Sequence, residues 1–346
     1  MRALLGASGN MYLILRKPTL NMAFFSVIIP IKNLNEYVAE NVAALLEQSF
    51  SDWELIIVTN EPTDNPWRDS RITLLHSGKV APGRKRDLGS MHAVGKVLVF
   101  LDDDSYPPPD YLRSAYDIFI NRSVKAVGGP GITPVSDGFW AQVSGAVFVS
   151  GLSGGNPARY LKLNNSSGKI YKDWPSVNLL VERDTFLAVG GFDCDFWPGE
   201  DTHLCRKMWD HARIGVEYQP GLAVEHHRRG SFLAHVHQVA QYGRVRGYFL
   251  RSIGVEVEDL KYWIPSVFFL FHCSVPLLLY AEGYSVIVSA YGAYLLVVSA
   301  ALVQISKRVG VLKAGASIPY IFATHFAYGF FFIKGILSKA VDPVLR

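Results

Sequence analysis

The sequence predicts an α/β domain followed by helices that span a membrane. Apolar segments of strand length alternate with helical patterns in the first half, a sequence order typical of doubly wound sheets. One apolar run ends in three aspartates, at Val97–Asp104. Long segments without charge fill the C-terminal part, in line with 49% hydrophobic and only 18% charged residues. A length of 346 residues suggests about two domains.

The cysteines and the net charge exclude two classes of protein. Cys194, Cys205 and Cys273 have no metal-ligand spacing and give no disulfide framework, which is usual at a reducing cytosolic face. A formal net charge of +4 is too small to indicate nucleic-acid binding. We therefore expect no nucleic-acid partner and assign the excess charge to an anionic membrane surface.

Residues 1–22 combine a short apolar patch with Arg2, Arg16 and Lys17. No good cleavage site follows, so we do not interpret them as a signal peptide. They fit an amphipathic leader, a membrane-surface anchor, or an extension upstream of a start at Met22.

From Phe24 onward, strands and helices alternate. Phe24–Pro30 reads as a strand, and an apolar stripe from Leu34 to Leu46 then predicts a helix with Asn33 or Asn35 as its N-cap. Later segments extend the pattern. They are strands at 54–58, 72–75, 97–101, 124–131, 176–181 and 222–225, and helices at 83–95 and 111–120.

The three aspartates after Val97–Leu101 are the first candidate site. The unbroken apolar run fits a strand buried on both faces of a parallel sheet, and ligands bind at the carboxyl ends of such strands. Adjacent carboxylates repel one another, and a divalent cation relieves that repulsion. In an extended segment Asp102 and Asp104 share one side while Asp103 points away. An acidic turn that caps the next helix is the alternative.

Two segments are similar to the opening blocks of family 2 glycosyltransferases, the nucleotide-sugar enzymes of GT-A fold. The first block resembles SVIIPIKNLNEYVAENVAALLEQSFSDWELIIV, and the second resembles GRKRDLGSMHAVGKVLVFLDDDS, which leads into the metal-binding DXD motif. The resemblance covers roughly residues 24–250. It implies a Rossmann-like, nucleotide-sugar-binding GT-A domain over 23–250 and a membrane domain over 251–346.

The resemblance also implies the donor site. Asp102 and Asp104 match the acids that hold Mg²⁺ or Mn²⁺. An acid usually follows the second strand of this family and contacts the nucleotide base, but Thr59 and Asn60 stand there, so Asn60 takes that role or is a plain turn residue. Arg84 and Lys85 read as a solvated helix start. The implied donor-binding residues are Pro30, Asn33, Glu36, Asn60, Arg86, Asp102 and Asp103.

The acceptor side is implied by GGFD…GED at Gly190–Asp201. An acid pair at a helix N-terminus is also a plain helix cap. The resemblance makes Asp201 the catalytic base, with Glu200 beside it in contact with the acceptor. Residues 150–170 are rich in Gly, Asn and Ser, which suits a mobile loop over the donor or a surface excursion.

Histidines and arginines follow the strand near residue 225. His226 fits the family position that completes the metal shell better than His227 does, and Arg228 and Arg229 would lie near the diphosphate. QYGRVRG at 241–247 resembles the end of the same domain and lacks the QxxRW motif of processive synthases. That absence favours transfer of a single sugar.

Three uncharged segments predict membrane spans at 263–281, 284–305 and 316–333. The first two would form a tight hairpin at Glu282-Gly283. Basic residues before the first span and after the second place both sets in the cytosol and the C-terminus outside, although Lys339 and Arg346 weaken that inference. His272 and His325 read as packed polar residues. A buried helical core of a soluble domain is the alternative.

These patterns together predict an inverting glycosyltransferase in the plasma membrane, multi-pass, with a cytosolic catalytic domain. It would move one sugar from a nucleoside-diphosphate sugar to a hydroxyl of a lipid-linked or glycan acceptor. The tail HFAYGFFFIKGIL resembles membrane-bound bacterial or archaeal members that build glycolipids and surface polysaccharides. The alternatives are a polyprenyl-phosphate glycosyltransferase and an inactive, membrane-anchored nucleotide-sugar-binding protein.

Overall fold

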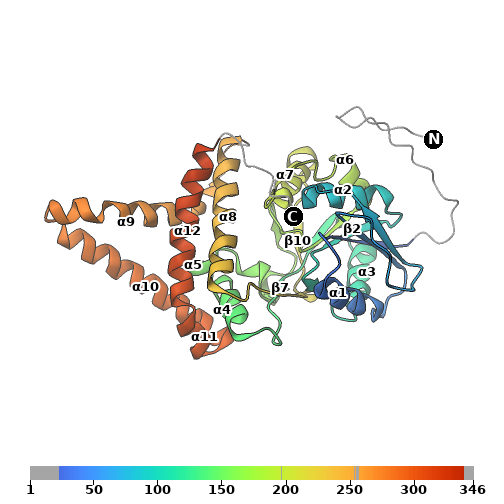
Figure 1. Cartoon of the computed structure of the whole chain (residues 1–346), viewed down its shortest axis with the longest axis horizontal. Coiled ribbons are helices and arrows are strands. Elements are labelled where there is room, and N and C mark those ends of the chain that lie inside the picture. The colour runs from blue at the N-terminus through green and yellow to red at the C-terminus, as the bar shows by residue number, and fades with distance from the viewer. Residues whose placement is uncertain (1–22, 196, 253, 255–256, 339–346) are drawn as a thin grey trace.

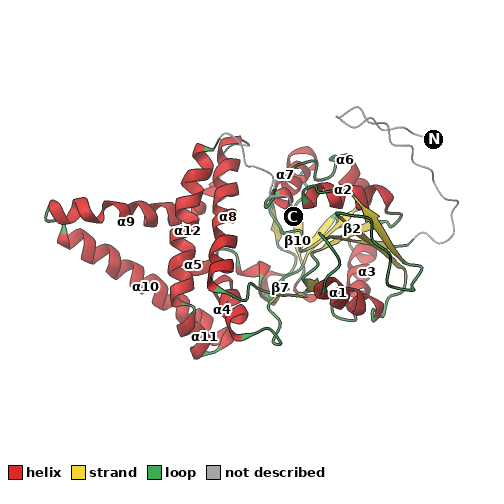
Figure 2. Cartoon of the chain, viewed as in Figure 1, coloured by secondary structure: helices red, strands yellow, loops and turns green. Residues whose placement is uncertain are grey.

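The computed structural model describes residues 23–195, 197–252, 254 and 257–338. The predictions for residues 1–22, Lys339 and Arg346 lie outside this range. A sheet domain packs beside a group of long helices (Figure 1), and the strands all belong to the sheet-domain side (Figure 2).

The main sheet has eight strands in the order β3-β2-β1-β4-β9-β6-β10-β8. β1, β2, β3 and β4 pair in parallel, as the apolar runs predict. β9 lies antiparallel between β4 and β6, so the sheet is mixed and not uniformly parallel. The bounds are β1 Phe25–Pro30, β2 Trp53–Thr59, β3 Ile72–His76, β4 Val97–Leu101, β6 Ala126–Gly128, β8 Ile170–Tyr171, β9 Asn178–Glu182 and β10 Val216–Tyr218.

Helices cover both faces of this sheet. Side chains alternate along a strand, so Val27 of β1 faces one apolar core while Ile28 faces the other. The first core includes α1 and α3, and the second includes α6 and α7. The bounds are α1 Glu36–Leu46, α2 Pro82–His92, α3 Tyr111–Asn121, α6 Arg183–Ala188 and α7 Glu200–Ala212.

A small second sheet carries the order β5-β11-β7, with bounds Ser105–Tyr106, Val224–His226 and Gly131–Ile132. The strand expected at 124–131 is split into β6 and β7. Gly129 lies in the break, where a Cβ atom would come within 1.8 Å of the Leu222 carbonyl oxygen. Only glycine allows that close approach.

The helical part contains the three predicted spans as helices that are long and apolar enough to cross a membrane. Tyr280 ends α9 and Tyr284 begins α10, which confirms the hairpin. The bounds are α4 Phe139–Phe148, α5 Gly151–Gly154, α8 Phe232–Ser252, α9 Ile264–Tyr280, α10 Tyr284–Val309, α11 Val311–Ala316 and α12 Ile318–Leu337, with 3₁₀ turns at Pro157–Arg159, Asn164–Ser166, Pro220–Leu222 and Val257–Trp263.

Two segments join the sheet domain to these helices. α4 shares an apolar core with α10 and α12 through residues such as Val147 and Ile305. Residues 150–170 contain α5 and two 3₁₀ turns, and the Ser150 hydroxyl donates to Gln304 of α10 at 2.8 Å. This stretch is therefore attached to the long apolar helices.

Candidate active site

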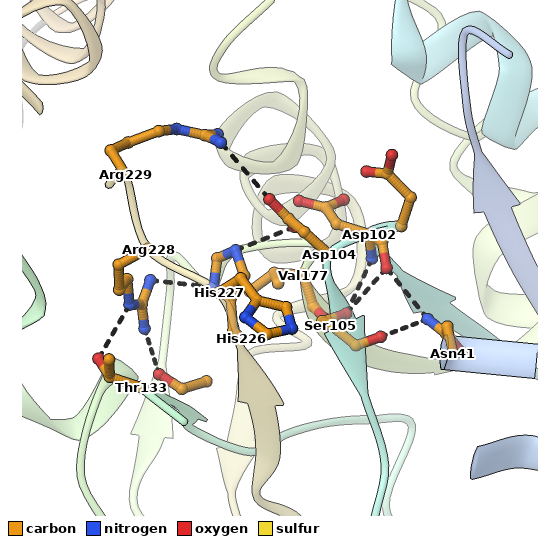
Figure 3. A network of polar contacts seen from close by, with 12 residues as sticks. Asn41, Asp102, Asp104, Ser105, Thr133, Val177, His226, His227, Arg228 and Arg229 are labelled. Atoms are coloured by element: carbon orange, nitrogen blue, oxygen red, sulfur yellow. Dashed lines mark hydrogen bonds and ion pairs between the residues drawn. The ribbon is translucent and has the colours of Figure 1, made fainter. Parts of the chain in front are cut away.

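Asp102, Asp104 and His226 form a cluster that could hold a metal ion. Each offers a ligand atom, and these atoms all lie within 4.8 Å of one another. The aspartates follow β4, and His226 ends β11, whose pairing sets His226 opposite Ser105 of β5. Figure 3 shows the result, with His226 Nε2 3.2 Å from an Asp104 carboxylate oxygen.

Asp104 lies close to positively charged arginine side chains. Arg229 Nη1 lies 3.6 Å from its second carboxylate oxygen. Burial opposes ionisation of Asp104, but His226, Arg229 and Arg228 outweigh it and hold the pKa of this carboxyl below its usual value. Asp104 therefore stays an anion, the form that binds a cation.

Arg228 points away from the aspartates. Its guanidinium donates to His226 Nδ1 at 2.9 Å, to the Thr133 hydroxyl and to the Gly131 carbonyl oxygen (Figure 3). A guanidinium only donates, so in this arrangement Nδ1 of His226 accepts and Nε2 carries the ring proton toward Asp104. For Nε2 to bind a cation, that proton must move to Nδ1 and the hydrogen bond from Arg228 must break. Arg228 thus orients the imidazole, and Arg229 is the arginine that faces the aspartates.

His227 lies in a different group. Its ring nitrogens contact Asp137 at 2.5 Å and Glu40 at 2.9 Å, and burial is outweighed by these two acids, which raise the pKa of His227. Of the two neighbouring histidines, the structure places His226 beside the aspartates.

Asp102–Asp104 form a turn and not the extended segment that the prediction assumed, closed by a 3.2 Å hydrogen bond from the Ser105 amide to the Asp102 carbonyl oxygen. Within this turn Asp103 faces the start of α1. Its carboxylate accepts a 2.7 Å hydrogen bond from Asn35, whose own oxygen caps α1 by accepting from the Val38 amide. Of the two candidate N-caps, Asn35 is therefore the cap. It also ties α1 to the aspartate loop.

Arg86 links the two acidic motifs. Its buried guanidinium contacts Asp102 and donates to Glu200 at 2.8 Å. Lys85 corrects the expectation of a solvated helix start, because it is only 2% exposed and donates to Asn60 and to the Ile31 carbonyl oxygen. Burial lowers the pKa of Lys85 to about 8. Arg84 is half-exposed and pairs with Asp193 and Asp195.

Asp201 sits in the first turn of α7. Its carboxylate accepts from the Thr202 amide at 2.7 Å and from the Ser176 amide at 3.3 Å. Burial, followed by repulsion from Asp173, raises the pKa of Asp201. Burial likewise raises the pKa of neighbouring Glu200, to about 7, although Arg86 opposes the shift.

An ion network beside Asp201 has no counterpart in the sequence-based predictions. Asp173 accepts from Arg246 and, at 2.9 Å, from Arg159, while Thr202 donates to its second oxygen at 2.9 Å. Arg246 belongs to the basic segment already singled out on α8. Asp173 and Arg159 stand in no motif, and only the fold brings them to this place.

One cavity of about 1010 Å³ joins these groups. It is lined by both acidic motifs, so Asp201 opens into the same space as Asp102 and Asp104. The other predicted residues that line it are Pro30, Arg86, Asp103, Glu200, His226, Arg228 and Arg229. Asn33, Glu36 and Asn60 do not line it: the first two are exposed, and Asn60 is buried against Lys85.

The donor set fits a hard divalent cation. Two carboxylates and one imidazole are ligands that Mg²⁺ and Mn²⁺ accept, and the remaining coordination positions face the cavity, where phosphate oxygens could enter. The arrangement can therefore hold a cation and a diphosphate together, because the three ligand atoms lie within 4.8 Å of one another beside the cavity.

Comparisons with known proteins identify the domain. Residues 26–178 match the model of glycosyl transferase family 2. The chain carries a family 2 glycosyltransferase domain. Its sheet and helices resemble GT-A glycosyltransferases, with a TM-score of 0.53 and 18% identity to the mannosyltransferase PcManGT of Pyrobaculum calidifontis, over 94% of this chain and 89% of that one.

Similar curated proteins are also glycosyltransferases. AglE of Haloferax volcanii is 26% identical over 56% of this chain and 63% of its own length. The glucosyltransferase WfgD of Escherichia coli, whose name gives an α-D-GlcNAc-diphosphoundecaprenol acceptor, is 31% identical over 30% of this chain and 44% of its own. The chain matches less than two thirds of the length of these relatives.

Proposed function

We propose that this glycosyltransferase moves one sugar from a nucleoside-diphosphate sugar to a hydroxyl of a lipid-linked or glycan acceptor, with inversion at the anomeric carbon. The observation that carries the proposal is the shared cavity, in which Asp201 faces the same space as Asp102, Asp104 and His226. The PcManGT structure, which holds GDP-Man and Mn²⁺, and the acceptor in the name of WfgD support it.

Asp102, Asp104 and His226 would hold Mg²⁺ or Mn²⁺, which supplies positive charge to the departing diphosphate. Arg229 adds charge at the same place, and Arg86 keeps Asp102 oriented. Pro30 and Asp103 would line the donor. Asn33 and Glu36 lie outside the cavity and Asn60 is buried against Lys85, so these three would act on donor binding only indirectly. Arg228 would release Nδ1 of His226 when Nε2 binds the cation, because a ring nitrogen that ligates a metal leaves the proton on the other nitrogen.

Asp201 would take the proton of the acceptor hydroxyl while that oxygen attacks the anomeric carbon from the face opposite the diphosphate. The new bond joins the acceptor oxygen to the anomeric carbon, and the bond to the diphosphate breaks with its electrons. A raised pKa brings a carboxylate closer to neutral pH, where a general base works best. Glu200 would contact the acceptor from the neighbouring position.

The test uses the full chain in detergent with a panel of nucleotide sugars and Mn²⁺. Thermal stabilisation identifies the donor, and slow donor hydrolysis then shows that the site is active without knowledge of the acceptor. We expect one donor class to raise the melting temperature only when Mn²⁺ is present. Stabilisation by every nucleotide without metal, together with no hydrolysis, would favour an inactive binding protein.

A polyprenyl-phosphate glycosyltransferase remains the second candidate, because the far end of the cavity is apolar. Its acceptor is already an anion and needs no general base. Transfer to polyprenyl phosphate that survives Asp201→Asn would favour this alternative. On either proposal the chain is a multi-pass protein of the plasma membrane with a cytosolic catalytic domain.

A further inference from the structure

The cavity continues from the acidic motifs into the membrane helices. Its far end, here called the lipid-side chamber, is lined by Val267, Phe268 and Phe271 of α9, by Ala293 and Val297 of α10, and by Tyr328 of α12. The same helices also contribute Tyr294, Thr324 and His325 to the cavity lining, and Tyr294 and His325 are hydrogen-bonded to each other at 3.1 Å. Most of the other side chains offer no hydrogen bond to a sugar. Along the apolar stretches of α9 and α10 only 6% and 11% of residues are buried inside the chain, so most of their side chains are free to contact lipid.

A positive charge lies where the chamber meets the catalytic end. Arg159 and Arg246 line the cavity there, and Asp173 binds both. The two guanidinium groups face Asp173 and neighbouring Asp201, so these four side chains balance in charge when both acids are ionised, and the net positive charge comes from Lys261, which lines the same cavity. A phosphate group would be bound at this point, between Asp201 and the apolar chamber.

We propose that the lipid-side chamber holds the hydrocarbon chain of a polyprenyl diphosphate-linked acceptor. The diphosphate binds beside Arg159 and Arg246, and the sugar that it carries reaches Asp201. This proposal rests on the proposed function and names its acceptor class. A free glycan would leave the chamber without an occupant, whereas a long chain matches both its apolar lining and its position inside membrane helices.

The experiment uses the full chain in nanodiscs with a diazirine-bearing polyprenyl diphosphate as the probe. Ala293→Trp fills the chamber, and Ala300→Trp is its matched control, an exposed alanine on the same helix that does not line the cavity. We expect labelling of α9 and α10 peptides to fall at least about tenfold in the first variant and less than about twofold in the second, since an indole at position 293 occupies space that the hydrocarbon chain would need.

Competition on the unmodified chain tests the phosphate. Polyprenyl diphosphate should prevent labelling at a concentration at least about tenfold lower than polyprenol does, because the charge-assisted contacts are absent from the alcohol. Equal labelling of both tryptophan variants, or equal competition by phosphatidic acid, would overturn the proposal. The Mn²⁺ affinity of both tryptophan variants, measured by EPR, should equal that of the unmodified chain. A wrong acceptor proposal can therefore be told apart from a wrong assignment of the metal site.

A second inference comes from the packing of α12 along α8. Gly247 of α8 lies so close to α12 that a Cβ would come within 2.0 Å of the Phe332 carbonyl oxygen, and Gly335 of α12 approaches the Arg244 carbonyl oxygen equally closely. Such contact holds the two helices together along their length. α8 carries Arg244, Arg246 and Arg251, which are costly inside a bilayer.

α9 runs in another direction. It crosses α12 steeply in Figure 1. In the part of the chain that the structure describes, the aromatic contacts between the two helices involve only the first half of α9, for example Phe268 and His272. Two helices that cross so steeply cannot both run close to the membrane normal. We infer that α12 lies with α8 at the membrane surface and that only the α9–α10 hairpin crosses the bilayer.

Cysteine labelling from each side of sealed vesicles tests this topology. In a Cys273→Ser background, Leu337→Cys should react with an impermeant maleimide from the same side as Lys307→Cys. Glu282→Cys, at the tip of the hairpin, should react only from the opposite side. Labelling of Leu337→Cys from the side of Glu282→Cys would restore three crossings and an external C-terminus.

Discussion

The donor and acceptor halves of the cavity shift the pKa of an aspartate in opposite directions. At the donor half, Asp104 has His226 and Arg229 beside it, and its pKa lies below the usual value. At the acceptor half, burial and the neighbouring Asp173 raise the pKa of Asp201 although the Thr202 amide donates to it. Environments that separate two pKa values in this way let one carboxylate bind a cation while another takes up a proton.

The largest expected effect tests the acceptor half. Asp201→Asn should lower kcat by about 10²–10⁴-fold, the usual contribution of a general base, because the amide keeps the shape and cannot take a proton. Donor affinity, measured by thermal stabilisation with Mn²⁺, should stay the same. Asp210→Asn, on the exposed side of α7, is the control. Normal turnover in Asp201→Asn would remove this residue from the mechanism.

A substitution in the donor half should instead weaken metal-dependent donor binding. Asp104→Asn should raise the Mn²⁺ concentration for half-maximal donor binding by about 100-fold or more, because partners outside the first coordination shell already cost about 10–100-fold. Titration calorimetry checks this value. An unchanged metal requirement would mean that the cation binds elsewhere. Asp103→Asn, whose side chain is turned toward Asn35, should change it far less.

The pH dependence of stability tests the environment of Glu200 in the acceptor half. Burial raises its pKa to about 7, so its neutral form is the one that the fold favours. Its contribution to stability is therefore complete below about pH 4.5, the ordinary value for a glutamate, and is lost as pH rises through about 7. Over that window the melting temperature should fall by a few degrees more than in Glu200→Gln. Parallel curves would contradict the shift.

The smallest effect is expected at Asn60. Its side chain is buried against Lys85 and does not line the cavity, so Asn60→Asp should alter the preference among nucleotide bases by less than about tenfold. The same panel of nucleotide sugars measures it. A complete switch of base would mean that Asn60 reaches the donor directly.

Much of the fold could be predicted from local patterns. The apolar runs at β1, β2 and β4 are buried strands, and Asn35 caps α1 in the segment where a cap was expected. The separation of Asp103 from its neighbours was predicted from alternation in an extended segment, but the segment forms a turn, in which Asp103 accepts from Asn35. The antiparallel strand β9 could not be predicted, because an apolar run carries no information on strand direction.

The sequence alone determined which side chains could carry the chemistry and which segments suit lipid, since apolar runs, turn residues and acid motifs are local properties. The resemblance already favoured His226 over His227, and the tertiary structure brings His226 to the aspartates through the pairing of β11 with β5. Only the tertiary structure buried Lys85 and brought Asp173, Arg159 and Arg246 to the side of Asp201. Contacts between residues far apart in the chain depend on how the sheets and helices pack, and no short segment encodes that packing.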